Sequence, residues 1–394
     1  MRSEQTLCAY PWNNLTIDPD GKVRPCCKYE SYYADSSGTY LNINQQSLEQ
    51  IWDSTAIENL KKSFLAGKKI KECSRCWDEE NIGMRSMRQE AFLHRPIGDF
   101  NSMKSAAPKS LDIKLNNLCN LKCRICGPWL STKWIAEAQD TGKWNVDEFI
   151  KISKSSFLDN DVNKSTLEKW ADNLELVEIF GGEPLINEDF YQVLEILTQK
   201  ENSKNVSVIL NSNGTVFSEK LVDYSKKLKK VTLNLSIDDL FERFEYQRHG
   251  AKWKNVVANI EKYSQLKSDQ LQPIIYITVG ILNIFYLRDI FNFFRTQFPT
   301  LWVYINLVHY PSYYSIVNLP EQLKMTIRNK LDDYSKEVLP NTEKDIQNIV
   351  NFMFSKKQDL KSWEKFLSFN ESCDVYRKEN FSETFPAFSA ELSL

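Results

Sequence analysis

The sequence predicts an α/β fold in which a parallel sheet forms a barrel or an open part of one, and three observations support it. Strand-like and helix-like segments alternate from residue 111 onward. About the first 100 residues are rich in cysteine, turns and charge, and about the last 75 are mostly helical in pattern. Parallel strands with helical crossovers belong to sheets buried on both faces. We therefore divide the chain into an N-terminal module (residues 1–100), a barrel (101–310) and a helical extension (311–394).

The N-terminal module contains one hairpin signal and one helix signal. The stretch "LTIDPDGKV", Leu15 to Val23, has two short extended runs around Pro-Asp-Gly, which predicts a hairpin. The stretch from Ser47 to Gly67 reads as one helix, with Ser47 as N-cap, Gln50 three residues later and a terminal glycine. So small a module needs a metal to stabilise it.

The barrel segment contains six predicted strands separated by helical segments. The predicted strands are Leu111–Leu115, Leu176–Phe180, Val206–Leu210, Val231–Ile237, Ile274–Ile281 and Trp302–Val308. The predicted helices include Asp189–Lys200, Ser218–Leu228, Trp253–Leu266 and Ile284–Phe298. Residues 143–173 form an insertion before the second strand. In a barrel of this type the chemistry lies at the carboxyl ends of the strands.

Charge and hydropathy exclude several classes of function. The 50 basic and 52 acidic residues nearly cancel, so we expect neither nucleic acid nor a membrane surface as a partner. The longest apolar stretch, Pro273 to Leu287, is too short to span a membrane, and the N-terminus has no signal-peptide core. A cytoplasmic location is expected. In that reducing environment the nine cysteines are expected to be metal ligands or reactive thiols.

Three cysteines, Cys119, Cys123 and Cys126, follow the first barrel strand with the spacing C-x3-C-x2-C. A structural zinc site takes four protein ligands. Three thiolates in one loop instead suit an iron-sulfur cube with one iron open to a small molecule, which makes such a cluster catalytic. The spacing therefore raises the question of what binds the open iron.

Polar motifs follow the other strands where each of them ends. The second strand is followed by "FGGEPLIN", the third by "NSNGT", the fourth by "LSIDD" and the sixth by His309. The residues singled out are Gly181, Gly182, Glu183, Pro184, Asn211, Asn213, Ser236 and Asp238. Taken alone, each motif is more often a tight or helix-capping turn. Paired glycines, however, let a backbone approach a ligand closely, and a carboxylate holds an ammonium group.

The cysteine motif after the first strand, followed by Gly-Gly-Glu-Pro after the second, resembles the radical S-adenosylmethionine (SAM) superfamily. The resemblance covers about residues 111–310, with Ile125 where family members often have an aromatic residue. It implies a partial (β/α)6 TIM-like barrel. It also implies that SAM chelates the open iron of a reduced [4Fe-4S] cluster and is cleaved to a 5′-deoxyadenosyl radical, which abstracts a hydrogen atom from a substrate.

The resemblance also implies roles for the polar residues. Gly182 and Glu183 would lie against the SAM amino group, Asn213 and Ser236 near its ribose or carboxylate, and Arg248 of "YQRHG" near the carboxylate. Asp238 would lie near the ribose. Cys119, Cys123 and Cys126 would hold the cluster.

The five cysteines of the N-terminal module resemble those of a SPASM auxiliary-cluster module, or of its shortened form, twitch. They are Cys8, Cys26, Cys27, Cys73 and Cys76. The resemblance implies a second, auxiliary [4Fe-4S] cluster held by Cys8, Cys26, Cys73 and Cys76, with Cys27 spare or substituting. A fully ligated cluster passes electrons, which favours a net oxidation of the substrate. The spacing alone also allows a four-cysteine zinc ribbon.

Two isolated residues have two interpretations each. Cys373 is either a buried small hydrophobe or a hydrogen donor to a substrate radical, which would make the enzyme a redox-neutral epimerase. His309 is either a packed histidine or an acid or base at the substrate site. We expect a peptide, protein or small-molecule substrate such as a sugar, and an electron donor such as a flavodoxin or ferredoxin. A non-catalytic zinc protein is the alternative from another class.

Overall fold

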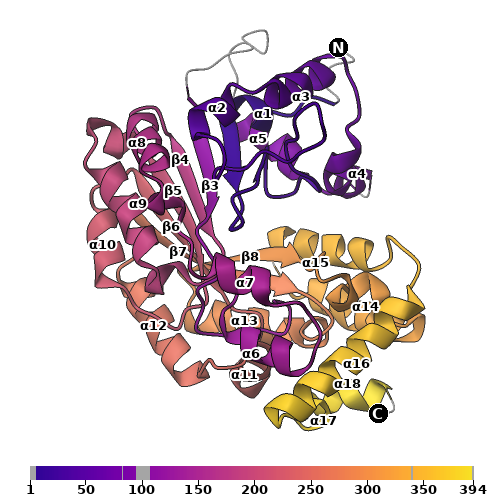
Figure 1. The fold of residues 1–394 in the computed structure, drawn as a ribbon. Helices are drawn as coiled ribbons and strands as arrows, with labels where there is room; N and C mark the ends of the chain where they lie inside the picture. The colour runs from indigo at the N-terminus through magenta and orange to yellow at the C-terminus, as the bar shows by residue number, and fades with distance from the viewer. Residues whose placement is uncertain (1–5, 82, 95–106, 339, 393–394) are drawn as a thin grey trace.

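The computed structural model describes residues 6–81, 83–94, 107–338 and 340–392, and its strands form one open sheet (Figure 1). The order across the sheet is β2-β1-β3-β4-β5-β6-β7-β8. The strands are β1 (Asn14–Ile17), β2 (Val23–Arg24), β3 (Ser110–Lys114), β4 (Leu176–Phe180), β5 (Ser207–Ser212), β6 (Lys230–Ser236), β7 (Leu271–Val279) and β8 (Trp302–Leu307). Only β1 and β2 pair antiparallel; every other described pair is parallel. The α/β parallel-sheet prediction is confirmed.

Each of the six predicted barrel strands is present, with its ends shifted by at most three residues. The structure adds that the predicted hairpin joins the same sheet, because β1 pairs in register with β3. The N-terminal module is thus continuous with the barrel through backbone hydrogen bonds. The boundary predicted between residues 100 and 101 lies outside the described residues.

The helices form three groups along the chain. The N-terminal group comprises α1 (Tyr10–Asn13), α2 (Leu48–Trp52), α3 (Thr55–Leu65), α4 (Ser74–Asn81) and α5 (Met87–His94). The barrel group comprises α6 (Lys133–Asp140), α7 (Asp147–Ile152), α8 (Asp161–Trp170), α9 (Glu188–Thr198), α10 (Glu219–Ser225), α11 (Phe241–Gln247), α12 (Trp253–Gln265) and α13 (Leu287–Gln297). The C-terminal group comprises α14 (Glu321–Ser335), α15 (Pro340–Met353), α16 (Leu360–Arg377), α17 (Phe381–Thr384) and α18 (Pro386–Leu392).

The helix predicted from Ser47 to Gly67 is two helices, so that prediction is wrong in one respect. Ser47 does cap α2, and the reciprocal bonds with Gln50 are present. Asp53, however, ends α2, and Ser54 has extended backbone angles before α3. The periodic pattern continues across this break because both helices bury apolar residues against one core.

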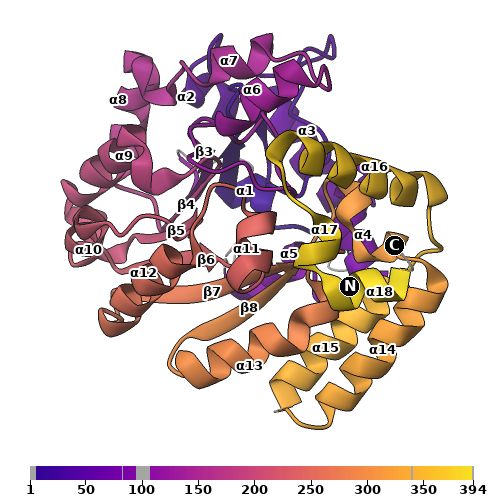
Figure 2. The same ribbon diagram turned by 90° about the horizontal axis from the view of Figure 1, so that it is seen from below.

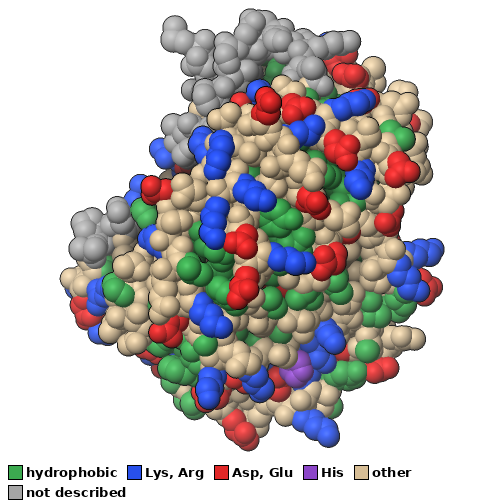
Figure 3. Space-filling model, turned by 90° about the vertical axis from the view of Figure 1, so that its left-hand side faces the viewer, with side chains coloured by type: hydrophobic (Ala, Val, Ile, Leu, Met, Phe, Trp, Pro, Cys, Tyr) green, Lys and Arg blue, Asp and Glu red, His purple; other side chains and the backbone are tan. Residues whose placement is uncertain are grey.

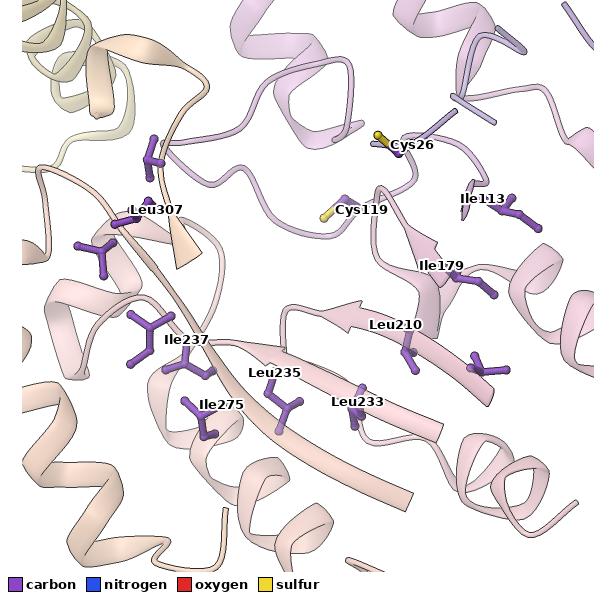
Figure 4. Close-up of a cluster of buried hydrophobic side chains, with 14 of the residues drawn as sticks. Cys26, Ile113, Cys119, Ile179, Leu210, Leu233, Leu235, Ile237, Ile275 and Leu307 are labelled. Carbon is purple, nitrogen blue, oxygen red and sulfur yellow. The ribbon is translucent and has the colours of Figure 1, made fainter. Parts of the chain in front are cut away.

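The two faces of the sheet differ in chemistry. The outer face, covered by α8, α9, α10, α12 and α13 in Figures 1 and 2, carries buried aliphatic residues. Figure 4 shows several of them along the strands, with Cys26 and Cys119 on loops at one end of this cluster. The inner face carries Asp112, Glu178, Asn211, Asn234 and Tyr276, which the strand register places on the side opposite the aliphatic residues. The inner face is thus lined by polar and aromatic side chains, of which Asp112 and Asn234 are buried.

The surface matches the near-zero net charge of −2. On the face shown in Figure 3, basic and acidic side chains are interspersed and neither sign forms a large patch. Within the described ranges, none of the helices combines the length and apolar character that crossing a bilayer requires.

Candidate functional site

The loop that follows β3 brings the three barrel cysteines into a fixed, largely buried position. Cys119 is buried, and Cys123 and Cys126 are half-buried. The amide of Cys126 donates to the carbonyl of Cys123 at 3.0 Å, and the indole of Trp134 donates to the same carbonyl at 2.9 Å. The loop is therefore ordered by the protein itself.

The three thiols act electrostatically on one another. Burial, followed by the charge of the neighbouring Cys123, raises the pKa of Cys119 to about 12. Burial also raises the pKa of Cys126, followed by the charges of Cys123 and Cys119. Arg248 opposes this effect for Cys123, with its Nη1 3.9 Å from the Cys123 sulfur. The thiols are thus close enough to act on one another electrostatically, and a bound cation or cluster would release their protons.

The Gly-Gly-Glu-Pro turn after β4 lies directly against the cysteine loop. Gly182 has φ +58°, and a Cβ built on it would lie 2.3 Å from the carbonyl oxygen of Leu118. The next amide, that of Glu183, donates to the same oxygen at 2.8 Å. Pro184 begins the short helical turn that follows. Only glycine allows this approach of the two loops.

Glu183 is a buried carboxylate with a raised pKa. It is 1% exposed and accepts hydrogen bonds from the Ser212 hydroxyl at 2.9 Å and the Asn213 amide at 2.7 Å. Burial raises its pKa to about 7, with these hydrogen bonds opposing the rise. An ammonium group beside it would stabilise the charged form.

Asn213 belongs to the same cluster of residues. Its side-chain amide donates to Asn120 at 2.8 Å and lies 3.9 Å from the Cys119 sulfur. Asn211 lies on β5, two residues before Asn213, and accepts a hydrogen bond from the Asn234 side chain at 2.8 Å on the inner face. Ser236 ends β6, in register with Tyr276 on that face. Asn213 therefore lies beside the cysteine loop, whereas Asn211 lies on the inner face of the sheet.

Asp238 and Arg248 form a buried pair next to the cysteines. Arg248 Nη2 donates to Asp238 at 2.7 Å, and the second Asp238 oxygen accepts from the Thr278 amide at 3.0 Å. Arg248 is 7% exposed, and its Nε has no partner among the described residues. A buried donor without a partner costs free energy, so this position suits a ligand carboxylate.

These observations fit a SAM-binding cluster. Three thiols that act on one another, a carboxylate suited to an ammonium and an unsatisfied guanidinium donor match the groups that such a cluster and SAM would present. Among the described residues, no three His, Cys, Asp or Glu side chains lie close enough to hold a single metal ion. A cubane takes one thiolate at each iron, so its ligands are spaced more widely than those of one ion.

Four N-terminal cysteines also converge. Burial raises the pKa of Cys26, and the charges of the other N-terminal cysteines add to the rise. Burial likewise raises the pKa of Cys73, followed by Cys8 and Cys76. Cys26 and Cys73 are thus within electrostatic reach of Cys8 and Cys76, and the role of these four as ligands of an auxiliary cluster stays a prediction.

Cys27 is oriented differently. Its sulfur lies 3.8 Å from the Met87 sulfur. Burial raises its pKa to about 11, followed by the charges of Asp112 and Glu178, which belong to the inner face of the sheet. Cys27 therefore lies between the N-terminal module and the inner face.

Asp112 is a buried polar residue of β3 that the sequence motifs do not single out. It is fully buried on the inner face, where one oxygen accepts from the Thr16 hydroxyl at 2.7 Å. Its Oδ1 has no hydrogen-bond partner in the described part of the chain. The signal was present, since an aspartate in the middle of a buried strand requires a reason.

His309 and Cys373 lie in separate places. His309 lines a cavity of about 530 Å³ with Arg75, Glu79 and Lys356, between α4 and the segment after β8. Burial lowers the pKa of His309 to about 3, with Arg75 and other cations contributing. Cys373 is fully buried on α16, where Arg377 and Arg124 are the first charges acting on its thiol. His309 and Cys373 thus lie apart from each other, and Arg75 of the His309 cavity also acts electrostatically on Tyr276 of the inner face.

The fold and site define an α/β iron-sulfur protein with one cysteine set at a barrel loop and a second in an N-terminal module. Residues 113–293 match the family model described as the radical SAM superfamily, and residues 8–77 match SPASM, an iron-sulfur cluster-binding domain. The chain therefore contains a radical SAM domain and, ahead of it in the sequence, a SPASM domain. These two domains imply a SAM-binding [4Fe-4S] cluster and an auxiliary iron-sulfur cluster.

Curated relatives match in part of their length. The chain is 26% identical to GTP 3′,8-cyclase of Aquifex aeolicus (strain VF5), over 32% of this chain and 35% of the relative. It is 27% identical to GTP 3′,8-cyclase of Mannheimia succiniciproducens, over 41% and 43%. It is 28% identical to molybdenum cofactor biosynthesis protein 1 of Dictyostelium discoideum, over 41% and 22%. The chain thus spans less than half the length of these relatives.

Solved structures show weaker likeness. Native anSMEcpe with bound AdoMet is 20% identical, with a TM-score of 0.41, over 58% of this chain and 61% of that one. Streptococcus suis SuiB is 12% identical, with a TM-score of 0.38, over 82% and 68%.

Proposed function

We propose that this protein reductively cleaves SAM at the barrel cluster and uses the resulting radical to oxidise a substrate held on the inner face of the sheet. The observation that carries the proposal is the convergence of Cys119, Cys123 and Cys126 with Glu183 and Arg248. Glu183 would hold the SAM ammonium, and the unsatisfied Arg248 Nε would hold its carboxylate. The cluster supplies the electron, and these residues orient the bound SAM.

The inner face supports a substrate between the two cysteine sets. Asp112 offers an unsatisfied acceptor there, and Tyr276 stacks on Tyr304 with ring centroids 4.9 Å apart. We infer a peptide or small molecule that presents hydrogen-bond donors to Asp112. The reaction named for the cyclases is not transferred to this chain, because the chain matches less than half of their length.

The convergence of four N-terminal cysteines supports the oxidative reaction. Four protein ligands leave no open iron, and such a cluster accepts an electron from a substrate radical. A flavodoxin or ferredoxin would supply the barrel cluster. Thiol ligands also require a reducing compartment, which is the basis for the proposed cytoplasmic location.

The first test is iron and sulfide content after anaerobic reconstitution. We expect about eight irons in the wild type and about four in the variant with Cys119, Cys123 and Cys126 replaced by alanine. The wild type reduced with dithionite should form 5′-deoxyadenosine from SAM, and the triple variant should not. Stoichiometric zinc in the N-terminal module, in place of iron, would refute the auxiliary cluster and favour the structural zinc alternative.

The epimerase alternative predicts a different outcome. If Cys373 donates a hydrogen atom, Cys373→Ala should still form 5′-deoxyadenosine while product falls or changes. Normal product from that variant would remove this alternative. Cys373 is fully buried within α16, and this burial favours the oxidative proposal over the epimerase alternative.

A further inference from the structure

The residue between the second and third barrel cysteines reaches into the C-terminal extension. Arg124 is fully buried. Its guanidinium donates to Asp374 at 2.5 Å and to Glu379 at 2.6 Å, and it also donates to the Asn370 side chain at 3.0 Å. Its contacts therefore lie about 250 residues along the chain, at the end of α16 and just beyond it.

The guanidinium is held on its other sides as well. It lies over the Tyr246 ring, 3.5 Å from the centroid, and its Nε donates to the Tyr246 carbonyl at 3.2 Å. The Arg124 amide donates to Gln247 at 2.8 Å. A planar group with five donors, fixed this completely, leaves the attached backbone little freedom.

A second link runs from Glu379 to the segment at the end of α11 that contains Arg248. His249 Nδ1 lies 2.6 Å from Glu379, whose other oxygen accepts from Arg124. Arg248, the residue before His249, is the one that approaches Cys123. One carboxylate thus connects the two segments that flank this cysteine.

The residue before Cys123 is fixed to the same layer. Lys122 Nζ donates to Glu137 at 2.7 Å, and Glu137 accepts from Arg377 of α16 at 3.0 Å. Glu137 is 1% exposed. Both neighbours of Cys123 are therefore attached to α16 or to the residues that follow it.

We propose that the C-terminal segment from Asn370 to Glu379 is a positioning element that sets the place of Cys123 through Arg124. The inference rests on the proposed role of Cys119, Cys123 and Cys126 as cluster ligands. Arg124 touches no reacting atom, so it acts through the cysteine loop. Buried ion pairs are costly to break from one side, because the remaining charge is then unpaired. The extension is in this way part of the cluster site.

The test compares Arg124→Gln with Lys324→Gln in the full-length reconstituted protein. Lys324 is also fully buried, and it pairs with Glu321 at 2.9 Å within α14, so it controls for the loss of a buried cation. Two quantities are measured: the rate at which a chelator removes iron, and the EPR spectrum of the reduced protein with and without SAM. The spectral change on adding SAM identifies the barrel cluster.

We expect Arg124→Gln to lose iron from the barrel cluster about tenfold faster than the wild type, as is typical when a ligand's supporting residue is removed. It should also show an altered SAM-dependent spectrum. Lys324→Gln should lower the unfolding temperature but leave the iron-loss rate and the spectrum unchanged. Equal iron-loss rates in the two variants would overturn the positioning role.

Glu379→Gln and Asp374→Asn keep the test decisive if Arg124→Gln does not fold, because each leaves Arg124 with one carboxylate. Each should speed iron loss less than Arg124→Gln does, and wild-type rates in both would refute the inference. Failure of the proposed function is a separate result. In that case the wild type itself would hold no iron that depends on Cys119, Cys123 and Cys126.

Discussion

Replacing Gly182 with alanine tests whether the contact between the Gly-Gly-Glu-Pro turn and the cysteine loop sets the geometry of the site. The added Cβ would lie 2.3 Å from the Leu118 carbonyl oxygen, whereas real contacts of this kind are essentially never below 3.0 Å. The loops must separate by at least 0.7 Å. A misplacement of about 1 Å near a reacting centre costs about 100-fold in rate. We therefore expect Gly182→Ala to slow SAM cleavage about 100-fold.

Gly181→Ala is the matched control for this prediction. Gly181 also has a positive φ, +84°, but its nearest neighbour would be the Lys114 Cβ at 3.3 Å. Both variants place alanine in left-handed backbone, at a cost of about 1–2 kcal/mol each. Only Gly182→Ala also pushes the cysteine loop away. The assay is 5′-deoxyadenosine formation by dithionite-reduced protein at saturating SAM, with unfolding temperatures recorded in parallel. Equal rates in the two variants would refute the close-contact argument.

Three further predictions follow from individual side chains. Because burial raises the pKa of Glu183 to about 7, SAM affinity should fall as the pH drops below 7, by about tenfold per unit; calorimetry should show no such slope for Glu183→Gln. Cys73→Ser should still cleave SAM in a single-turnover assay but yield no oxidised product, and full product would contradict electron transfer through the N-terminal module. The pKa of His309 is lowered from 6.5 to about 3 in the folded protein. As the pH falls below 6.5, the unfolded chain therefore protonates His309 while the folded protein does not, which favours unfolding. Metal-free wild type should thus lose up to about 2 kcal/mol between pH 7.5 and 5 that His309→Gln does not lose in urea titrations.

The barrel was predictable from sequence because its strands are short buried runs in alternation with helices. The cysteine spacing and Gly181-Gly182-Glu183-Pro184 also indicated the site, since each follows a strand and parallel strands end at one edge. The inner face could have been foreseen in part, because Asp112 interrupts an apolar strand. Sequence pattern was sufficient for these features because each depends on residues that are close together in the chain.

The remainder depends on contacts between distant parts of the chain. Nothing near Leu15 indicates that the hairpin pairs with β3, about 95 residues later, because a hairpin signal specifies only its own turn. Likewise, Cys26 and Cys27 are adjacent in sequence, yet they face different surroundings. Adjacent residues in an extended segment point to opposite sides, so the sequence predicts that Cys26 and Cys27 differ. It does not predict which of the two sides holds Cys8, Cys73 and Cys76.

The two cysteine sets are held by different means, and this difference explains why buried ion pairs surround the barrel loop. The barrel loop lies against Gly182 and is fixed through Arg124 and Lys122 to carboxylates on other elements. Three ligands alone leave a cluster one protein bond short, so the surrounding protein must fix their positions. The N-terminal set has four converging thiols, and a bound cluster would itself cross-link them. Without metal, the N-terminal module should therefore lose order at lower temperature than the barrel loop does.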